Sequence, residues 1–356
     1  MSTESASLFL LKLIEDNKKA KLITCCAFLD IKSAFDAAWH PAILNSLIKK
    51  GCPNFLVKIL GDFLSSRSST LTNASSSYTA NTELGCPQGS VLSPFLWNIF
   101  IEELLCLSFP FLFFILAYAD DIVLCAINKN FEIALANLQS MCDSAVAWGR
   151  SAKLTFNGLK SVFMVFSSKK NLPSLSLKVD DVCVPRSHSC LYLGLTIDDK
   201  LSWNIHITNK CSAVKKLLFL ILKCCRLSWG LSRNAISLLY KTTVIPTILY
   251  NCSVWASAIR RKRVITALKS AQRPFALAIG RLFKSTSTDA ALILANIFPL
   301  HLKVVETVIK RSISGLAVLL PPLIVSNCWR NLCNNFVLCN TSRHTSRSAQ
   351  KKNVAH

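Results

Sequence analysis

Strand-like and helix-like stretches alternate along residues 1–199. Unbroken apolar runs indicate buried strands, and apolar residues that recur every three or four positions indicate amphipathic helices. The expected strands are residues 23–31, two apolar arms within residues 111–125, and residues 154–166. The expected helices are residues 41–50, with Pro41 at the start and Gly51 as the stop, and residues 131–150. This order predicts an α+β fold, with helices packed on one face of an antiparallel sheet.

The rest of the chain has a different character. Residues 65–77 are rich in Ser and Thr and are expected to form a loop, and beyond residue 199 the pattern becomes helical. The net charge of +22 arises in this second part, which has 24 of the 41 Lys and Arg residues but only Asp289 and Glu306 as acidic residues. Such a basic region predicts a polyanionic partner, either nucleic acid or an anionic membrane.

Two apolar segments bear on the membrane alternative. Residues 104–119 and 313–325 are mostly apolar, but both are shorter than the roughly 20 residues of a spanning helix. Buried strands give the same signal, so we expect no membrane partner. Residues 8–11 are too short for a secretion signal, which predicts an intracellular protein of the nucleus or cytoplasm.

The 16 cysteines are then expected to be reduced and mostly small core residues, because none forms a Cys-x-x-Cys pair. The spacing of Cys328, Cys333, Cys339 and His344 is not that of a recognised zinc site, so a structural role is favoured there.

Acidic residues in apolar surroundings are the candidate chemistry. Asp30 ends a strand, and Asp120-Asp121 separates two apolar arms. Neighbouring strand residues point to opposite faces, so only one of the pair can share a site with Asp30, and Asp120 is the better candidate. Clustered carboxylates favour a cation, here two Mg²⁺ or Mn²⁺ ions. An exposed hairpin turn is the alternative, since Asp is common in turns.

Five segments resemble, in order, the conserved motifs of the reverse transcriptases of non-LTR (LINE-type, jockey-like) retrotransposons. They are residues 29–36 (LDIKSAFD), 85–94 (GCPQGSVLSP), 117–121 (AYADD), 154–161 (LTFNGLKS) and 192–198 (YLGLTID), similar to motifs A to E. Residues 239–246, 271–273 and 285–290, with Tyr250 and Trp255, look like the following thumb region.

The resemblance implies a right-hand polymerase: a palm with partial fingers over residues 1–199, a helical basic thumb over 200–281, and a connection-like or degenerate region over 282–356. It implies RNA-directed DNA polymerase activity, with an RNA template, a DNA primer and dNTP as partners and no identified protein partner.

The same resemblance implies roles for single residues. In the catalytic centre these are metal ligation by Asp30, Asp120 and the Ile31 carbonyl, support of the turn by Asp121, and protonation of pyrophosphate by Lys160. Around the nucleotide they are exclusion of the 2′-hydroxyl by Phe35 and nucleotide or template contact by Gln88, Gly89 and Tyr118. On the nucleic acid they are a primer grip formed by Tyr192, Leu193 and Gly194, and duplex contact by Arg260, Arg261, Lys262 and Arg263.

Alternatives stay open at several of these positions. Phe35 is also suited to core packing, Lys160 to a solvated charge, residues 87–89 to a plain turn, and residues 260–263 to a nuclear localisation signal. Because residues 2–4 resemble the end of a finger motif, we expect an N-terminally truncated fragment. A non-catalytic nucleic-acid-binding remnant is the alternative function.

Overall fold

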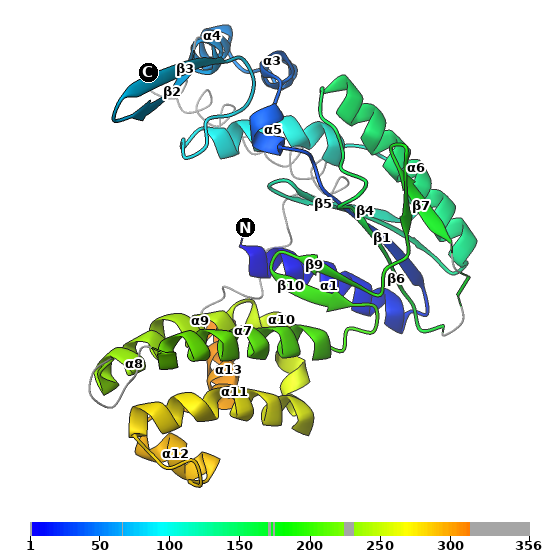
Figure 1. Cartoon of the computed structure of the whole chain (residues 1–356). Coiled ribbons are helices and arrows are strands. Elements are labelled where there is room, and N and C mark those ends of the chain that lie inside the picture. Colours follow the sequence, from blue (N-terminus) through cyan, green and yellow to red (C-terminus); the bar gives the residue numbers. More distant parts are fainter. Residues whose placement is uncertain (1, 66, 170–171, 174, 224–230, 314–356) are drawn as a thin grey trace, which may run out of the picture. The chain divides into compact units, whose positions relative to one another are not determined.

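The computed structural model describes residues 2–65, 67–169, 172–173, 175–223 and 231–313 (Figure 1). The chain divides into two compact units at Ser187 and His188. Within the described chain, the sheet unit comprises residues 14–187, and the helical unit comprises residues 2–13 and 188–313. Helix α1 (Thr3–Lys19) contributes residues to both. The polymerase subdomains expected from the sequence are not tested by this division and stay predictions.

A four-stranded antiparallel sheet forms the centre of the sheet unit. Its strands are β1 (Ile23–Leu29), β4 (Phe113–Tyr118), β5 (Asp121–Asn128) and β6 (Val162–Phe166), in the order β4-β5-β1-β6. Strand β1 lies between β5 and β6 and is buried along its whole length, which explains its unbroken apolar sequence. Its pairing with β5 runs from Ile23 opposite Asn128 to Leu29 opposite Ile122.

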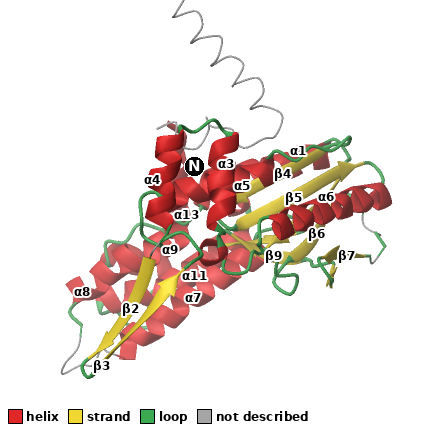
Figure 2. Cartoon of the chain, turned by 90° about the horizontal axis from the view of Figure 1, so that it is seen from above, coloured by secondary structure: helices red, strands yellow, loops and turns green. Residues whose placement is uncertain are grey.

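Helices cover the sheet face formed by Cys25, Ala27 and Leu29. These residues share one core with helices α3 (His40–Lys49), α5 (Ser93–Leu105) and α6 (Phe131–Ser151). Helix α6 packs on β1 and β5 and lies along the sheet in Figure 2. It begins where the Asn130 side chain accepts a hydrogen bond from the Glu132 amide, a normal N-cap. The α+β class predicted from the sequence is confirmed.

The prediction of a strand over residues 154–166 was wrong in its first half. Only β6 is a strand, and the segment before it turns, with the Lys160 amide donating to the Asn157 carbonyl at 3.1 Å. A single bridge joins Phe156 to Ile31. The Asn157-Gly158 pair favours a turn over a continued strand.

The Ser/Thr-rich segment is also not a loop. Strands β2 (Arg67–Asn73) and β3 (Ser76–Thr82) form an antiparallel hairpin, which stands apart from the four-stranded sheet in Figures 1 and 2. The Thr70 and Thr79 hydroxyls lie 3.0 Å apart across it, and β-branched Thr residues favour such pairing. The hairpin is exposed on both faces, so it lacks the apolar alternation that would have predicted strands.

Short elements complete the sheet unit. They are α2 (Ala34–Ala37), α4 (Asn54–Leu64), β7 (Ser176–Val179) and β8 (Val182–Pro185).

From His188 onward, the helical unit has one hairpin followed by helices, and the helices are as the sequence predicts. The hairpin strands are β9 (Ser189–Tyr192) and β10 (Leu195–Asp198). The helices are α7 (Asn204–Lys223), α8 (Arg233–Leu239), the π-helix Tyr240–Val244, α9 (Ile245–Leu249), α10 (Cys252–Trp255), the 3₁₀ helix Ala256–Arg260, α11 (Lys262–Gly280), α12 (Thr288–Leu294) and α13 (Leu300–Ile313). Buried Gln272 of α11 donates to both the Tyr240 hydroxyl and the Phe298 carbonyl at 2.8 Å, which ties these helices together.

The cysteines of the described chain are all free, and most are buried, as predicted. Residues 328, 333, 339 and 344 lie outside the described residues. The apolar stretch 104–119 consists of the end of α5, a connection and β4, while most of the stretch 313–325 is also outside the described residues. No described helix combines the length and apolar character needed to cross a membrane.

Candidate active site

The tight turn between β4 and β5 carries the paired acidic residues. Tyr118 pairs with Asp121, which leaves Ala119 and Asp120 as the two central residues of the turn. Ala119 has a φ of 54°, which fits the hairpin turns that match strand twist. Its carbonyl accepts a hydrogen bond of 2.8 Å from Nε1 of Trp97, a buried residue of α5. The core therefore holds the backbone of the turn that presents Asp120.

Asp30 follows the last residue of β1, and two hydrogen bonds hold its backbone in place. Its carbonyl accepts from the Asn157 amide at 2.7 Å, and its amide donates to the Ser161 hydroxyl at 3.4 Å. The β1–β5 register ends at Leu29 opposite Ile122, so one further step brings Asp30 alongside Asp121. The residues of the turn after α6 thus fix the position of Asp30 beside the acidic pair.

Negative charge accumulates at this place. The pKa of Asp121 is raised to about 6, first by burial and then by the negative charges of Asp120 and Asp30. A positive charge nearby is that of Lys160, whose Nζ lies 4.0 Å from an Asp30 carboxylate oxygen and whose side chain is 73% exposed. Such a weakly compensated group of carboxylates is suited to binding a cation.

The donor set is incomplete by itself. Across the described ranges, no three His, Cys, Asp or Glu side chains are arranged to hold a metal ion. Mg²⁺ is usually bound by one or two carboxylates, with substrate phosphates and water as further ligands. The grouped carboxylates of Asp30, Asp120 and Asp121 therefore fit a cation that is held jointly with a substrate.

Phe35 lies on α2, the short helix that follows Asp30 along the chain. Its half-buried ring is tilted against Trp97, with 5.0 Å between the ring centroids. The preceding Ser33 has a φ of 49°, so the chain turns sharply between β1 and α2. Trp97 therefore contacts both Phe35 and the Ala119 turn. Nothing in the local sequence identified this role of Trp97; a buried Trp needing a partner for its N–H is a weak signal.

The loop that begins at Gly85 packs on α2. The Gly85 amide donates to the Ala38 carbonyl, and the Cys86 amide donates to the Phe35 carbonyl, both at 2.8 Å. Gly85 has a φ of +84°, and a Cβ there would lie 2.7 Å from the Asp36 carbonyl oxygen. Only glycine fits this close approach of two backbones.

Further along the loop, Gln88 is exposed, and its amide donates to an Asp36 carboxylate oxygen at 3.0 Å. Gly89 has a φ of +85° and no other atom within 4 Å of its would-be Cβ. The loop thus places Gln88 and Gly89 beside α2, the helix that carries Phe35.

The predicted primer-grip and duplex-contact residues lie in the helical unit. Tyr192 is buried at the end of β9, and Leu193 and Gly194 form the turn between β9 and β10. Residues 260–263 are exposed where α11 begins, and Nη1 of Arg261 donates to the Ser202 carbonyl at 2.5 Å. That bond gives Arg261 a local structural contact in addition to its charge.

Comparison with known proteins identifies the family. Residues 2–197, more than half of the chain, match the model described as "Reverse transcriptase (RNA-dependent DNA polymerase)". The chain belongs to the reverse transcriptase family.

Curated relatives of this chain come from insect mobile elements. A putative 115 kDa protein of the type-1 retrotransposable element R1DM of Drosophila melanogaster is 27% identical over 77% of this chain and 26% of that protein. The RNA-directed DNA polymerase from mobile element jockey of the same species is 30% identical over 66% of this chain and 26% of that protein. The chain thus spans about a quarter of these relatives' length.

Among solved structures, apo telomerase from Candida tropicalis aligns with a TM-score of 0.42 and 13% identity, over 89% of this chain and 55% of that one. That likeness is too weak to inform the function.

Proposed function

We propose that this chain is the polymerase part of a non-LTR retrotransposon reverse transcriptase, and that it extends a DNA primer with dNTPs on an RNA template. The observation that carries the proposal is the convergence of Asp30, Asp120 and Asp121 at one end of the sheet, in a chain whose family is established. The R1DM and jockey relatives support the same assignment.

Asp30 and Asp120, with the Ile31 carbonyl, are proposed to hold two divalent cations, Mg²⁺ or Mn²⁺. Bound cations would supply activation of the primer 3′-hydroxyl and stabilisation of the leaving pyrophosphate. The accumulated carboxylate charge around Asp121 supports this ligand set, because a cation would relieve it. Asp121 would then support the turn and add negative charge near the cations.

Lys160 is proposed as the acid that protonates the pyrophosphate. Its ammonium lies near Asp30, at the edge where the triphosphate would meet the cations. A positioned proton donor of this kind lowers the barrier to leaving-group departure.

Sugar selection is assigned to Phe35. The ring contacts Trp97, so it cannot simply swing away, and a rigid ring beside the sugar would exclude a 2′-hydroxyl by steric clash. Gln88 and Gly89 are proposed to contact the nucleotide and template: the amide of Gln88 is oriented by Asp36, and Gly89 leaves open space for close approach. Tyr118, at the end of β4, is proposed to contact the same nucleotide.

Arg260, Arg261, Lys262 and Arg263 are proposed to contact duplex phosphates. They are exposed and lie in the half of the chain that carries the positive charge. Phosphate contacts of this kind give binding that tolerates sequence and weakens with salt.

The test is primer extension by the 356-residue chain on an RNA template with dNTPs and Mg²⁺. Extension is expected, and Asp30→Asn and Asp120→Asn are expected to abolish it with little loss of duplex binding. Asp181→Asn is the matched control, because Asp181 occupies the equivalent second position of the two-residue turn between β7 and β8, which also begins at a φ of 54°. Duplex binding without any extension would support the nucleic-acid-binding remnant instead.

A further inference from the structure

The turn between β9 and β10 is strained. Both of its central residues, Leu193 and Gly194, have positive φ angles, 45° and 74°. Turns of this type favour Asn-Gly, because a branched L-residue such as Leu is disfavoured in the left-handed region. A conformation of this kind persists only where neighbouring groups hold it.

Two side chains from the corner between α9 and α10 hold the turn. The Leu193 carbonyl accepts one hydrogen bond from the Tyr250 hydroxyl at 3.0 Å and another from Nδ2 of Asn251 at 3.3 Å. Gly194 rests on the same tyrosine, since a Cβ at this position would lie 2.9 Å from the Tyr250 ring. The turn therefore packs on Tyr250, and the two hydrogen bonds hold its strained residue, Leu193.

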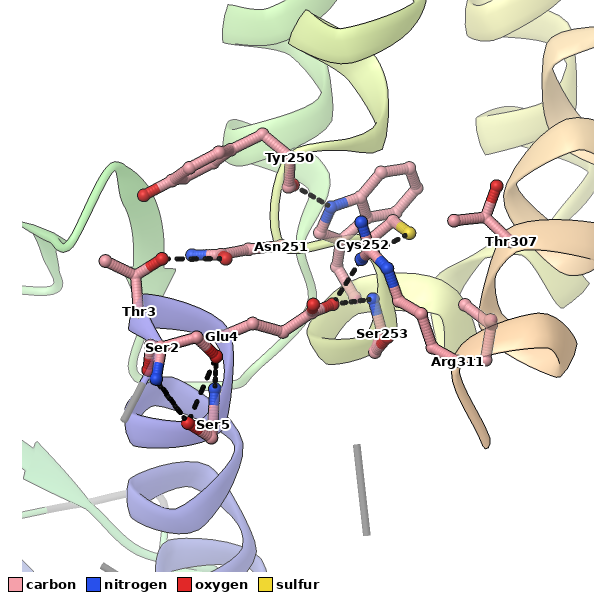
Figure 3. Close-up of polar contacts among 12 residues, drawn as sticks. Ser2, Thr3, Glu4, Ser5, Tyr250, Asn251, Cys252, Ser253, Thr307 and Arg311 are labelled. Carbon is pink, nitrogen blue, oxygen red and sulfur yellow. Dashed lines mark hydrogen bonds and ion pairs between the residues drawn. The ribbon is translucent and has the colours of Figure 1, made fainter. Parts of the chain in front are cut away.

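The corner is itself anchored. Figure 3 shows Asn251 facing Thr3, whose hydroxyl donates to Oδ1 of Asn251 at 3.4 Å. Because Oδ1 accepts this bond, Nδ2 is left to face Leu193. Asn251 is buried and has a φ of 49°, so its backbone makes the sharp bend into α10.

A partly buried ion pair fixes the residues that follow. One carboxylate oxygen of Glu4 accepts from the Ser253 amide at 3.0 Å and from Nη1 of Arg311 at 2.6 Å (Figure 3). The Glu4 side chain is 17% exposed, so the carboxylate is largely removed from water and needs these partners. The pair links the start of α1 and helix α13 to the corner.

The other side of the hairpin is also held. On β10, the Thr196 amide donates to Nδ1 of His206 at 3.2 Å, and His206 is buried in α7. At the turn itself, Gly194 is exposed and Leu193 is half-buried.

We propose that Tyr250 and Asn251 are positioning residues, which hold the Leu193–Gly194 turn in its left-handed conformation so that it supports the primer 3′ end. The primer contact of this turn rests on the proposed function. The holding of the turn does not, because it follows from the hydrogen bonds and the backbone angles alone.

The first experiment measures hydrogen exchange at the turn in the absence of any substrate. Hydrogen exchange is compared between the full chain and the Tyr250→Phe, Asn251→Asp double variant, in which both donors to Leu193 are lost and both shapes are kept. Exchange in peptides covering residues 189–198 is expected to quicken about tenfold, as for the loss of two modest hydrogen bonds. Exchange in β1 serves as the internal reference, and Tyr78→Phe with Asn81→Asp on the exposed β3 is the matched control. Unchanged exchange over residues 189–198 would overturn the proposal, whether or not the chain polymerises.

The second experiment measures nucleotide incorporation on a bound primer. With primer–template bound, the rate of single-nucleotide incorporation is expected to fall about tenfold in the double variant, with the dNTP concentration dependence unchanged. Tyr250→Phe alone, the milder change, is expected to give part of this loss. If the full chain is active and exchange quickens but the incorporation rate does not fall, the primer role is overturned. A full chain that never extends a primer would instead overturn the proposed function.

Rescue separates positioning from direct contact. Leu193→Asn places a residue that tolerates positive φ at the strained position, so the turn should depend less on its two donors. The loss caused by the double variant is therefore expected to shrink when measured in the Leu193→Asn background. An equal loss in both backgrounds would mean that Tyr250 and Asn251 do not act through the turn.

Discussion

Two glycines of one loop provide an internally controlled test of how the loop packs on α2. Gly85 and Gly89 have φ angles of +84° and +85°, so alanine at either position incurs the same backbone strain, about 1–2 kcal/mol. They differ in their surroundings: a Cβ at Gly85 would lie 2.7–2.9 Å from backbone atoms of Asp36 and Phe35, whereas none lies within 4 Å at Gly89.

Backbone atoms cannot rotate away, so Gly85→Ala must displace α2. Overpacking of this kind typically costs about 1–3 kcal/mol in addition to the strain. We therefore expect Gly85→Ala to lower the free energy of unfolding by about 2–5 kcal/mol and Gly89→Ala by about 1–2 kcal/mol. Urea unfolding of the full chain, followed by tryptophan fluorescence, measures both from the shift in midpoint at constant slope. Equal losses for the two variants would refute the close approach of the Gly85 loop to α2.

Three further predictions follow from single side chains. Trp97→Phe removes the hydrogen bond to the Ala119 carbonyl, so a loss of about 1 kcal/mol in unfolding free energy and a slower incorporation rate are expected in unfolding and primer-extension assays. Phe35→Ala is expected to raise ribonucleotide use relative to dNTP use in competition assays; unchanged selectivity would make Phe35 a packing residue only. The pKa of His206 is lowered to about 4, chiefly by burial, while the unfolded imidazole titrates near 6.5. Stability is therefore full above pH 6.5 and falls by up to about 3 kcal/mol as the pH drops toward 4, and His206→Asn should flatten this dependence of the urea midpoint.

The acidic site could be predicted from sequence because its signals are local. Asp30 and the Asp120-Asp121 pair each interrupt an apolar strand run, and strand alternation with the motif order was enough to place them at one end of a sheet. The structure refines this picture, because the β1–β5 register brings Asp30 alongside Asp121. The negative charges of Asp120 and Asp30 also help to raise the pKa of Asp121.

The supporting residues could not be predicted in this way. Trp97 and Ala119, or Asn251 and Leu193, meet through side-chain hydrogen bonds between segments far apart in the sequence. Periodicity reports which face of a helix is buried but not which carbonyl its polar atom will reach. The β2–β3 hairpin was missed for the opposite reason: both of its faces are solvated, so no apolar alternation marked it as paired strand.

The central claim is that Asp30 and Asp120 hold divalent cations for nucleotidyl transfer. Mn²⁺ binding, counted by the electron paramagnetic resonance signal of the free ion, tests it directly with dNTP and a primer–template whose primer lacks a 3′-hydroxyl. The full chain and Asp181→Asn are expected to bind Mn²⁺ alike at pH 7.5. Asp30→Asn and Asp120→Asn are expected to lose most of the Mn²⁺ binding that exceeds binding by dNTP and primer–template alone. Binding in the full chain should also weaken below pH 6, as Asp121 takes up a proton and the negative charge at the site falls. Undiminished Mn²⁺ binding in both the Asp30 and Asp120 variants would contradict the account.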